Sequence, residues 1–333
     1  MTFSSATLFL LKPSPRELAG PSLYIMFHPG ASGPGTSSAA AANAEPPAKL
    51  EISTRRSDIR MVTTDSKLGK LRSAVRSTGS AAIAFSGGSD SALVARIARE
   101  ELGGSTVAVT VDSPLYPRRE MRGARATAKA IGILHVVVRT DPFDYPGFSQ
   151  NPRDRCYICK LRTFKEVRDV ADARSLAHVL DGSNADDERS YRPGLKAKRE
   201  LGVRSPLAEA GLGKKDVGAI SRRLGLATHM KIPSPCLATR VPYGDRLTPG
   251  LLARIEKAEY YLIDKGFEQV RVRAHGDTAR IEVAKGQVRD VTRPETMDGV
   301  VRRLQNLGFA YVAVALEGYR RGRDRHGGVR VRP

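Results

Sequence analysis

A loop rich in serine and glycine, Ser86-Gly87-Gly88-Ser89-Asp90-Ser91, lies between an apolar segment and the start of an amphipathic helix pattern. Two adjacent glycines let the backbone approach a ligand closely, and the free amides of a helix N-terminus donate hydrogen bonds to an anion. The loop lacks the Gly-Lys-Ser/Thr ending of a Walker A loop, so it has no lysine for a γ-phosphate. The sequence therefore predicts a phosphate-binding loop of another kind, rather than an ordinary turn capped by serines.

The three cysteines are the second group with chemical potential, and we expect all of them in loops: Cys156, Cys159 and Cys236. A zinc site needs a fourth ligand, but His178 and His229 lie in or beside helix and strand patterns. Three thiolates can hold three irons of a 4Fe–4S cluster and leave the fourth iron open to an exogenous ligand such as sulfide. The sequence thus predicts a cluster, with a redox pair, a zinc site and unligated thiols as the alternatives.

Short apolar runs alternate with helix patterns through the middle of the chain, and the resulting fold must position both the phosphate loop and the cysteines. Short buried strands alternating with helices indicate a parallel sheet covered on both faces, in which ligands bind at the carboxyl ends of the strands. We expect strands at 81–85, 107–111, 134–138 and 176–180, and helices at 90–102, 118–131 and 160–173.

The pattern changes after Pro233 and Pro235, which indicates a second domain. Two strand-like segments there alternate apolar and charged residues with a period of two, and helix patterns flank them. We expect helices at 249–265 and 295–307, and strands at 269–274, 278–283 and 311–316. The predicted fold class is α/β: a parallel-sheet domain over residues 61–239, followed by a smaller α+β domain over 240–325.

The two ends of the chain have a different composition. Residues 1–60 are rich in small residues without an apolar period, which predicts a disordered extension, and helix signals begin only after Asp65. Met61 is an alternative start of the protein. Residues 326–333 form a basic tail.

Composition excludes several classes of protein. No apolar run approaches the roughly 18 residues of a membrane span, and three cysteines in 333 residues do not make a disulfide scaffold. We therefore expect a cytoplasmic protein. Fifty-five Lys and Arg against 35 Asp and Glu give a formal net charge of +20, which would suit phosphate-bearing partners.

Several motifs together resemble the LarE family, the ATP-dependent pyridinium-3,5-biscarboxylic acid mononucleotide sulfurtransferases. The resemblance runs from about residue 65 to 325 and rests on the phosphate loop and on segments 154–160, 180–187, 191–194, 235–244 and 270–273. The loop form, S-G-G-x-D-S, is similar to that of the N-type ATP pyrophosphatases, which include GMP synthetase and tRNA thiolases. The resemblance implies a PP-loop fold of the adenine nucleotide alpha hydrolase type for the first domain.

The resemblance also implies an activity. ATP would be cleaved between its α- and β-phosphates to adenylate each substrate carboxylate, and sulfur would then displace AMP to give thiocarboxylates for the nickel-pincer cofactor of lactate racemase. It adds Ser113 and Gly182 to an ATP site formed by the loop, with Mg²⁺ held by Asp90 and by acids of segment 181–187.

For the second domain, the resemblance implies that a pocket facing Cys236 contains five further residues: Glu259, Arg271, Arg273, Glu282 and Asp290. Pairs of guanidinium groups suit a substrate that bears one phosphate and two carboxylates. Taken alone, the alternation of arginines with acids on the two strands is more typical of a solvated sheet face.

Two branches of the family differ in the source of sulfur. One sacrifices the sulfur of a single cysteine, at the position of Cys236, and the other holds a cluster with three cysteines. Because Cys156 and Cys159 are also present, the sequence resembles the cluster branch. We expect a homo-oligomer, with a hexamer as one option, and other nickel-pincer biosynthesis proteins as partners. Membranes and nucleic acids are not expected partners, although a tRNA thiolase and a non-catalytic nucleotide-binding regulator remain alternative functions.

Overall fold

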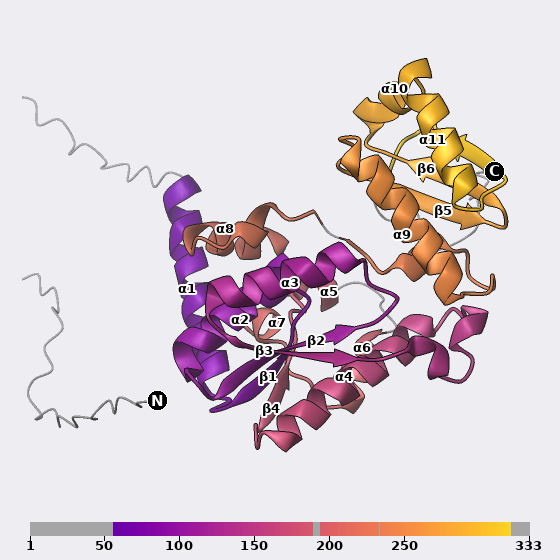
Figure 1. Cartoon of the computed structure of the whole chain (residues 1–333). Coiled ribbons are helices and arrows are strands. Elements are labelled where there is room, and N and C mark those ends of the chain that lie inside the picture. Colours follow the sequence, from indigo (N-terminus) through magenta and orange to yellow (C-terminus); the bar gives the residue numbers. More distant parts are fainter. Residues whose placement is uncertain (1–55, 189–193, 233, 321–333) are drawn as a thin grey trace, which may run out of the picture. The chain divides into compact units, whose positions relative to one another are not determined.

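The computed structural model describes residues 56–188, 194–232 and 234–320 (Figure 1). In these ranges, a parallel sheet has the strand order β3-β2-β1-β4. Its strands are β1 (Ala81–Ala84), β2 (Thr106–Asp112), β3 (Leu134–Arg139) and β4 (His178–Leu180). Because the strands are parallel, their carboxyl ends meet at one edge of the sheet, and those of β1 and β2 are neighbours. The predicted parallel sheet is confirmed.

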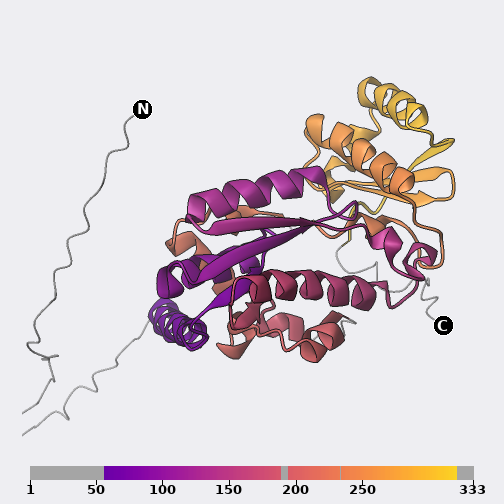
Figure 2. The ribbon, with the colours of Figure 1, turned by 60° about the horizontal axis from the view of Figure 1, so that its bottom comes forward.

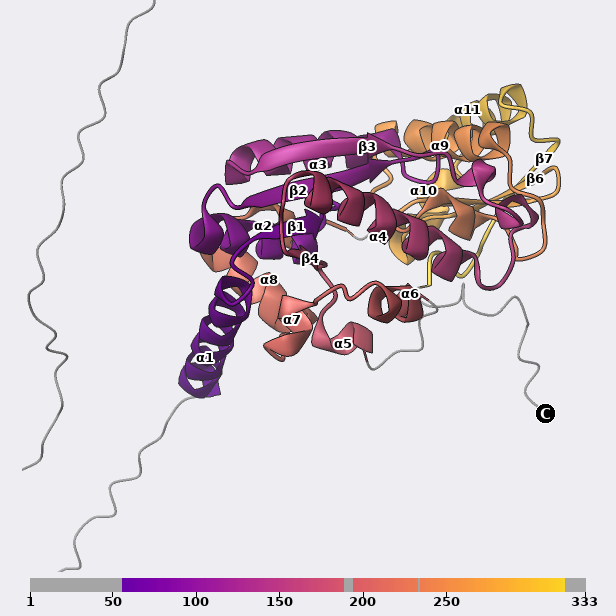
Figure 3. The same ribbon diagram turned by 90° about the horizontal axis from the view of Figure 1, so that it is seen from below.

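Helices cover both faces of this sheet (Figures 2 and 3). Ala81, Ile83 and Phe85 pack on one face against α2 (Ser89–Leu102) and α3 (Arg118–Ile131), beside α1 (Arg56–Arg76). Ala82 and Val107 face the opposite way and pack against α4 (Arg155–Ala173). Successive side chains of a strand point to opposite faces, so these short apolar strands are buried on both sides.

Two predicted boundaries are wrong. Helix α4 begins at Arg155 rather than near residue 160, so Cys156 and Cys159 lie in its first turns and not in a loop. A tertiary contact accounts for the early start: the Arg155 guanidinium, which is buried, hydrogen-bonds Asn151 and stacks on the Tyr243 ring. The first described helix, α1, begins at Arg56 rather than after Asp65. The remaining expectations for residues 1–55 and 326–333 lie outside the described residues.

Short helices follow β4, and none of them is among the helices predicted from the sequence. They are α5 (Ala185–Glu188), α6 (Gly194–Glu200), α7 (Pro206–Glu209) and α8 (Lys214–Arg223). Five 3-10 turns occur among the described residues: η1 (Pro142–Asp144), η2 (Phe148–Gln150), η3 (Ala227–Met230), η4 (Leu237–Arg240) and η5 (Lys285–Gln287).

A second sheet forms the core of the smaller α+β part, as predicted. Strand β6 (Thr278–Glu282) pairs antiparallel with β5 (Arg271–His275) and parallel with β7 (Tyr311–Val314). Three helices accompany it: α9 (Pro249–Asp264), α10 (Val288–Val291) and α11 (Pro294–Asn306). The side chain of Thr248 caps α9 by accepting the Leu251 N–H at 3.1 Å.

One apolar cluster joins the second sheet to residues of the first part of the chain. Leu115, Phe148 and Leu237 belong to the same buried cluster as the inner side chains of α9 and β5. The Leu237 N–H also donates to the Leu115 carbonyl at 2.7 Å. The division at residue 240 therefore stays a prediction. None of the helices in the described ranges has the length and apolarity needed to cross a membrane.

A histidine supports the end of β1, where the phosphate loop begins. The Thr110 hydroxyl donates to the Phe85 carbonyl at 2.6 Å, so its oxygen accepts from His135 Nε2 at 2.8 Å. A hydroxyl has one proton to donate, and Thr110 gives it to Phe85, so His135 must be the donor in the second bond. Neutral His135 therefore carries its proton on Nε2. The imidazole packs edge-on against the Phe85 ring, with 5.7 Å between the ring centres.

We expect His135 to make stability depend on pH. Burial lowers the pKa of His135, and the charge of Arg125 lowers it further. The unfolded chain therefore binds the proton at higher pH than the folded chain, so stability falls as the pH drops below about 6.5. The free energy of unfolding is measured by urea denaturation at about pH 7.5 and at about pH 5.5. Between these two pH values, it should fall less in His135→Gln than in wild type. Equal losses in the two proteins would contradict the assignment.

Candidate active site

The phosphate loop joins β1 to α2 and is closed by its own serines. Ser91 Oγ accepts the Ser86 N–H at 3.2 Å and donates to the Gly88 carbonyl at 3.2 Å. Gly87 has φ +66°, and a Cβ there would lie 2.5 Å from the Ala124 Cα of α3. Glycine is therefore required at this position, both for the backbone conformation and for the packing against α3.

The structure brings the predicted loop residues together with Gly182. A Cβ on Gly182 would lie 2.7 Å from the Ser91 nitrogen. The backbone after β4 therefore packs directly against the first turn of α2, with no room for a side chain between them. Ser89 and Asp90 form the start of α2, where free amides face an incoming anion. Ser113 follows β2, the strand next to β1, and its hydroxyl accepts the Leu115 N–H at 3.1 Å; its part in the ATP site stays a prediction.

The acids predicted to hold Mg²⁺ differ in their surroundings. Asp181 is buried and accepts hydrogen bonds from the Ser183 and Ser205 hydroxyls, each at 2.5 Å. Asp186 accepts the Lys214 N–H at 2.8 Å, and Asp187 accepts from Asn184.

These three acids therefore accept hydrogen bonds from other parts of the protein. Asp90, in contrast, lies on the loop itself and forms an ion pair with the Lys214 ammonium. Of these four acids, Asp90 is the one on the loop, and its role as a Mg²⁺ ligand stays a prediction.

The three thiols lie within electrostatic range of one another. Burial raises the pKa of Cys159 to about 11, and Cys236 adds to the rise. Burial and then Cys236 also raise the pKa of Cys156. The pKa of the buried Tyr116 phenol is raised well above 10, first by Cys159 and also by burial and the other two cysteines.

Tyr116 therefore lies near all three cysteines and hydrogen-bonds Cys159. A void of about 10 Å³, large enough for at most one water molecule, is lined by Ser113, Tyr116 and Cys159 among others. Within residues 56–188, 194–232 and 234–320, however, no three His, Cys, Asp or Glu side chains are arranged to hold a metal ion. The thiols have the chemistry of cluster ligands, but they do not form a closed metal site.

A buried ion pair holds the backbone at Cys236. Arg240 Nε and Nη2 donate to the two carboxylate oxygens of Glu259, at 2.8 and 2.9 Å. The third nitrogen, Nη1, donates to the carbonyls of Pro235 and Cys236, at 2.8 and 3.1 Å. Both side chains of the pair are almost completely buried, with exposed fractions of 0% and 3%.

Glu259 also accepts the Val272 N–H of β5 at 3.0 Å. The structure therefore gives Glu259 a positioning role rather than an open carboxylate. Sequence reasoning missed its partner Arg240, although this residue lies inside the recognised 235–244 segment.

A second ion pair reaches the same segment from the sheet. Arg273 Nε donates to Glu282 at 2.7 Å, and its Nη1 donates to the Thr239 carbonyl at 2.9 Å. Arg271, Arg273 and Glu282 are buried, with exposed fractions of 4%, 7% and 8%. A solvated sheet face is therefore the wrong interpretation for these three residues. Burial lowers the pKa of Arg271, and the neighbouring charge of Arg240 lowers it further.

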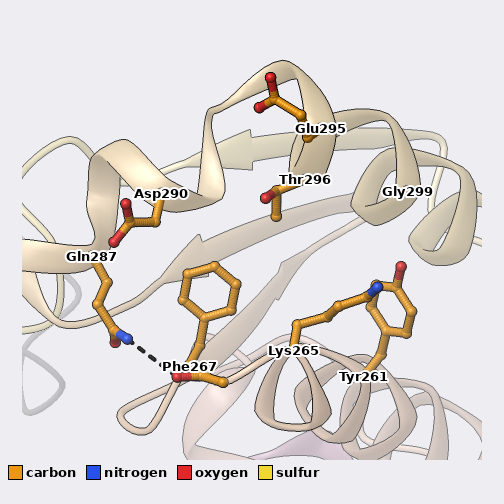
Figure 4. Close-up of a pocket in the computed structure, with 9 residues that line it drawn as sticks. Tyr261, Lys265, Phe267, Gln287, Asp290, Glu295, Thr296 and Gly299 are labelled. Atoms are coloured by element: carbon orange, nitrogen blue, oxygen red, sulfur yellow. Dashed lines mark hydrogen bonds between the residues drawn. The ribbon is translucent and has the colours of Figure 1, made fainter.

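Asp290 lies in a different place. Its carboxylate pairs with Arg293 at 3.1 Å, and it lines a cavity of about 310 Å³ with Tyr261, Lys265, Gln287 and Glu295 (Figure 4). No cysteine lines this cavity in the described part of the chain. The structure thus joins Glu259, Arg271, Arg273 and Glu282 to the Cys236 segment, whereas the catalytic role of Asp290 stays a prediction.

Comparisons with known proteins identify the family. Residues 69–149, which contain the phosphate loop, match the asparagine synthase family. A pyridinium-3,5-bisthiocarboxylic acid mononucleotide synthase of Lactiplantibacillus plantarum is 39% identical over 264 residues, which cover 79% of this chain and 95% of the relative. The chain belongs to this family, LarE.

Two further relatives match over a similar share of the chain. An uncharacterized protein of Synechocystis is 42% identical over 259 residues, 78% of this chain and 97% of its own length. A glutamine-hydrolyzing GMP synthase subunit of Halobacterium salinarum is 28% identical over 250 residues, 68% of this chain and 80% of its own length. The predicted LarE membership and the PP-loop fold class are confirmed.

We expect the Arg240–Glu259 pair to be essential for stability in this LarE-family chain. Arg240→Met leaves the Glu259 carboxylate buried without its cation, which should cost about 3–5 kcal/mol of unfolding free energy. The double variant Arg240→Met/Glu259→Leu contains no buried charge at this place and should recover a large part of the loss. Chemical denaturation measures both variants. Wild-type stability in Arg240→Met would show that the pair does not hold this segment.

Proposed function

We propose that this LarE-family chain is an ATP-dependent sulfurtransferase that converts the carboxylates of pyridinium-3,5-biscarboxylic acid mononucleotide into thiocarboxylates. The observation that carries the proposal is the order of two neighbouring strands. The phosphate loop follows β1, and the segment after β2 carries Tyr116, which lies near the three cysteines. The proposed activating site and the proposed sulfur site are therefore assigned to neighbouring strand ends of one sheet.

The chemistry begins with ATP on the phosphate loop. A substrate carboxylate oxygen attacks the α-phosphorus, the bond from that phosphorus to the β-phosphate oxygen breaks, and pyrophosphate leaves with the electron pair. The product is an acyl adenylate. Activation is needed because a free carboxylate resists sulfur nucleophiles, whereas AMP is a good leaving group. In this scheme Asp90 exchanges Lys214 for Mg²⁺ on the phosphates.

Arg271 is the residue that we assign to a substrate anion. It lies in a buried environment near Arg240, whose own charge is paired with Glu259. In water-poor surroundings a charge-assisted hydrogen bond to a carboxylate or phosphate is strong. Arg240, Glu259, Arg273 and Glu282 act in the proposal through the backbone at Cys236, which they position.

We further propose that Cys156, Cys159 and Cys236 hold a 4Fe–4S cluster. Bound there, such a cluster would supply an open iron able to carry sulfide for the acyl adenylate. After burial, the proximity of Cys236 raises the pKa of both Cys156 and Cys159, which supports a common site for the three thiols. Loading requires the thiols to move closer together and to release their protons, since thiolates are the ligands. We also propose a cytoplasmic homo-oligomer that works with other nickel-pincer biosynthesis proteins.

Asp90→Asn tests the activating step. The variant removes the carboxylate charge that we assign to Mg²⁺, which should cost about 3 kcal/mol of transition-state stabilisation and slow pyrophosphate release on the order of 100-fold. Release is measured with saturating ATP and the dicarboxylate mononucleotide. Asp172→Asn, on an exposed carboxylate of α4, is the control and should match wild type. Unchanged release from Asp90→Asn, or release that does not depend on the mononucleotide, would contradict the proposal.

Single cysteine variants test the sulfur site. Anaerobically purified wild type should contain about four iron atoms per chain, and Cys156→Ser, Cys159→Ser and Cys236→Ser should each lose most of the iron and the activity. The mass of the wild-type chain should be the same before and after turnover.

A loss of about 34 Da at Cys236, with single-turnover activity retained in Cys156→Ser and Cys159→Ser, would instead identify Cys236 as a sacrificed sulfur donor, because C–S cleavage leaves dehydroalanine.

A further inference from the structure

The phosphate loop contains no lysine, yet a lysine from a distant segment reaches it. The Lys231 ammonium donates to the Gly87 carbonyl at 3.0 Å, across 144 residues of sequence. It also forms an ion pair with Glu120 of α3 at 2.8 Å. Lys231 follows η3 and comes five residues before Cys236, in a segment to which the sequence assigned no role in ATP binding.

These contacts hold the ammonium at the loop without using all of its donors. An ammonium group has three N–H donors, and the described residues accept two of them, at Gly87 and Glu120. The Lys231 side chain is 26% exposed, so the third donor can reach solvent or a ligand. A Cβ on Gly123 of α3 would lie 3.4 Å from the Lys231 nitrogen, so the ammonium rests against bare helix backbone.

The other lysine at the loop is placed differently. The Lys214 ammonium pairs with the Asp90 carboxylate at the start of α2, where it neutralises the expected metal ligand. Lys231, in contrast, contacts the backbone of the glycine pair that forms the phosphate cradle. Glu120 fixes the position of its ammonium, so that little side-chain entropy is lost when an anion binds.

We propose that Lys231 binds the pyrophosphate part of ATP and stabilises pyrophosphate as it leaves. The inference rests on the proposed function, since it assigns a cation to the same ATP site. During adenylation, negative charge accumulates on the β-phosphate oxygen as its bond to the α-phosphorus breaks. An ammonium held in advance at the loop stabilises that charge without reorganisation. Lys231 thereby supplies the cation that a Walker A loop carries within its own sequence.

Binding of magnesium pyrophosphate and of AMP to the full-length chain tests the proposal, by titration calorimetry. Lys231→Met removes the charge and keeps the aliphatic stem, whereas Lys231→Arg keeps the charge. Lys215→Met, at an exposed lysine of α8, is the control for a general loss of positive charge. We expect Lys231→Met to bind pyrophosphate about 10- to 100-fold more weakly and AMP with unchanged affinity. Lys231→Arg should retain most of the pyrophosphate affinity, and Lys215→Met should match wild type.

Two outcomes would contradict the role of Lys231 without contradicting the proposed function. Unchanged pyrophosphate affinity in Lys231→Met would remove Lys231 from the phosphate site. Equal weakening of pyrophosphate and AMP would show that Lys231 only supports the fold. If the wild-type chain binds neither ATP nor pyrophosphate, the proposed function fails, and the inference fails with it.

Discussion

The buried ion pair between Arg240 and Glu259 is the interaction on which the arrangement of the site depends. It joins three elements at once: η4 through Arg240, α9 through Glu259, and β5 through the Val272 N–H that Glu259 accepts. A buried charge pair is stabilising only when its remaining hydrogen-bonding groups are satisfied. Here the remaining guanidinium nitrogen is satisfied by the carbonyls of Pro235 and Cys236. The hydrogen bonds that satisfy the buried guanidinium group therefore also determine the backbone position of Cys236.

One short stretch of chain connects the two chemical groups of the molecule. Lys231 contacts the phosphate loop at one end of this stretch, and Arg240 is fixed in the second core at the other. Between them, the Leu237 N–H donates to the Leu115 carbonyl beyond β2. The segment that carries Cys236 is thus attached to the loop, to the end of β2 and to α9. This attachment ties the Cys236 segment to the phosphate loop.

Much of the fold was predictable because its signals are local. The alternation of short apolar strands with helices follows from side-chain periodicity, and the loop between β1 and α2 follows from two glycines and three serines. The start of α4 was not predictable in this way. Arg155 is buried against Asn151 and Tyr243, and Tyr243 lies 88 positions further along the chain, so the first turns with Cys156 and Cys159 depend on a distant contact.

By itself, the sequence determined the family, the parallel sheet with its phosphate loop, and the set of residue types available for chemistry. Tertiary structure decided which of those residues face one another. Asp181, Asp186 and Asp187 belong to one motif, yet they bond to Ser205, Lys214 and Asn184, whereas Asp90 is the acid on the loop itself. Arg273 and Glu282 look like a solvated strand face, yet packing against η4 buries them. Burial and pairing depend on segments far apart in the chain, and local spacing carries no information about such contacts.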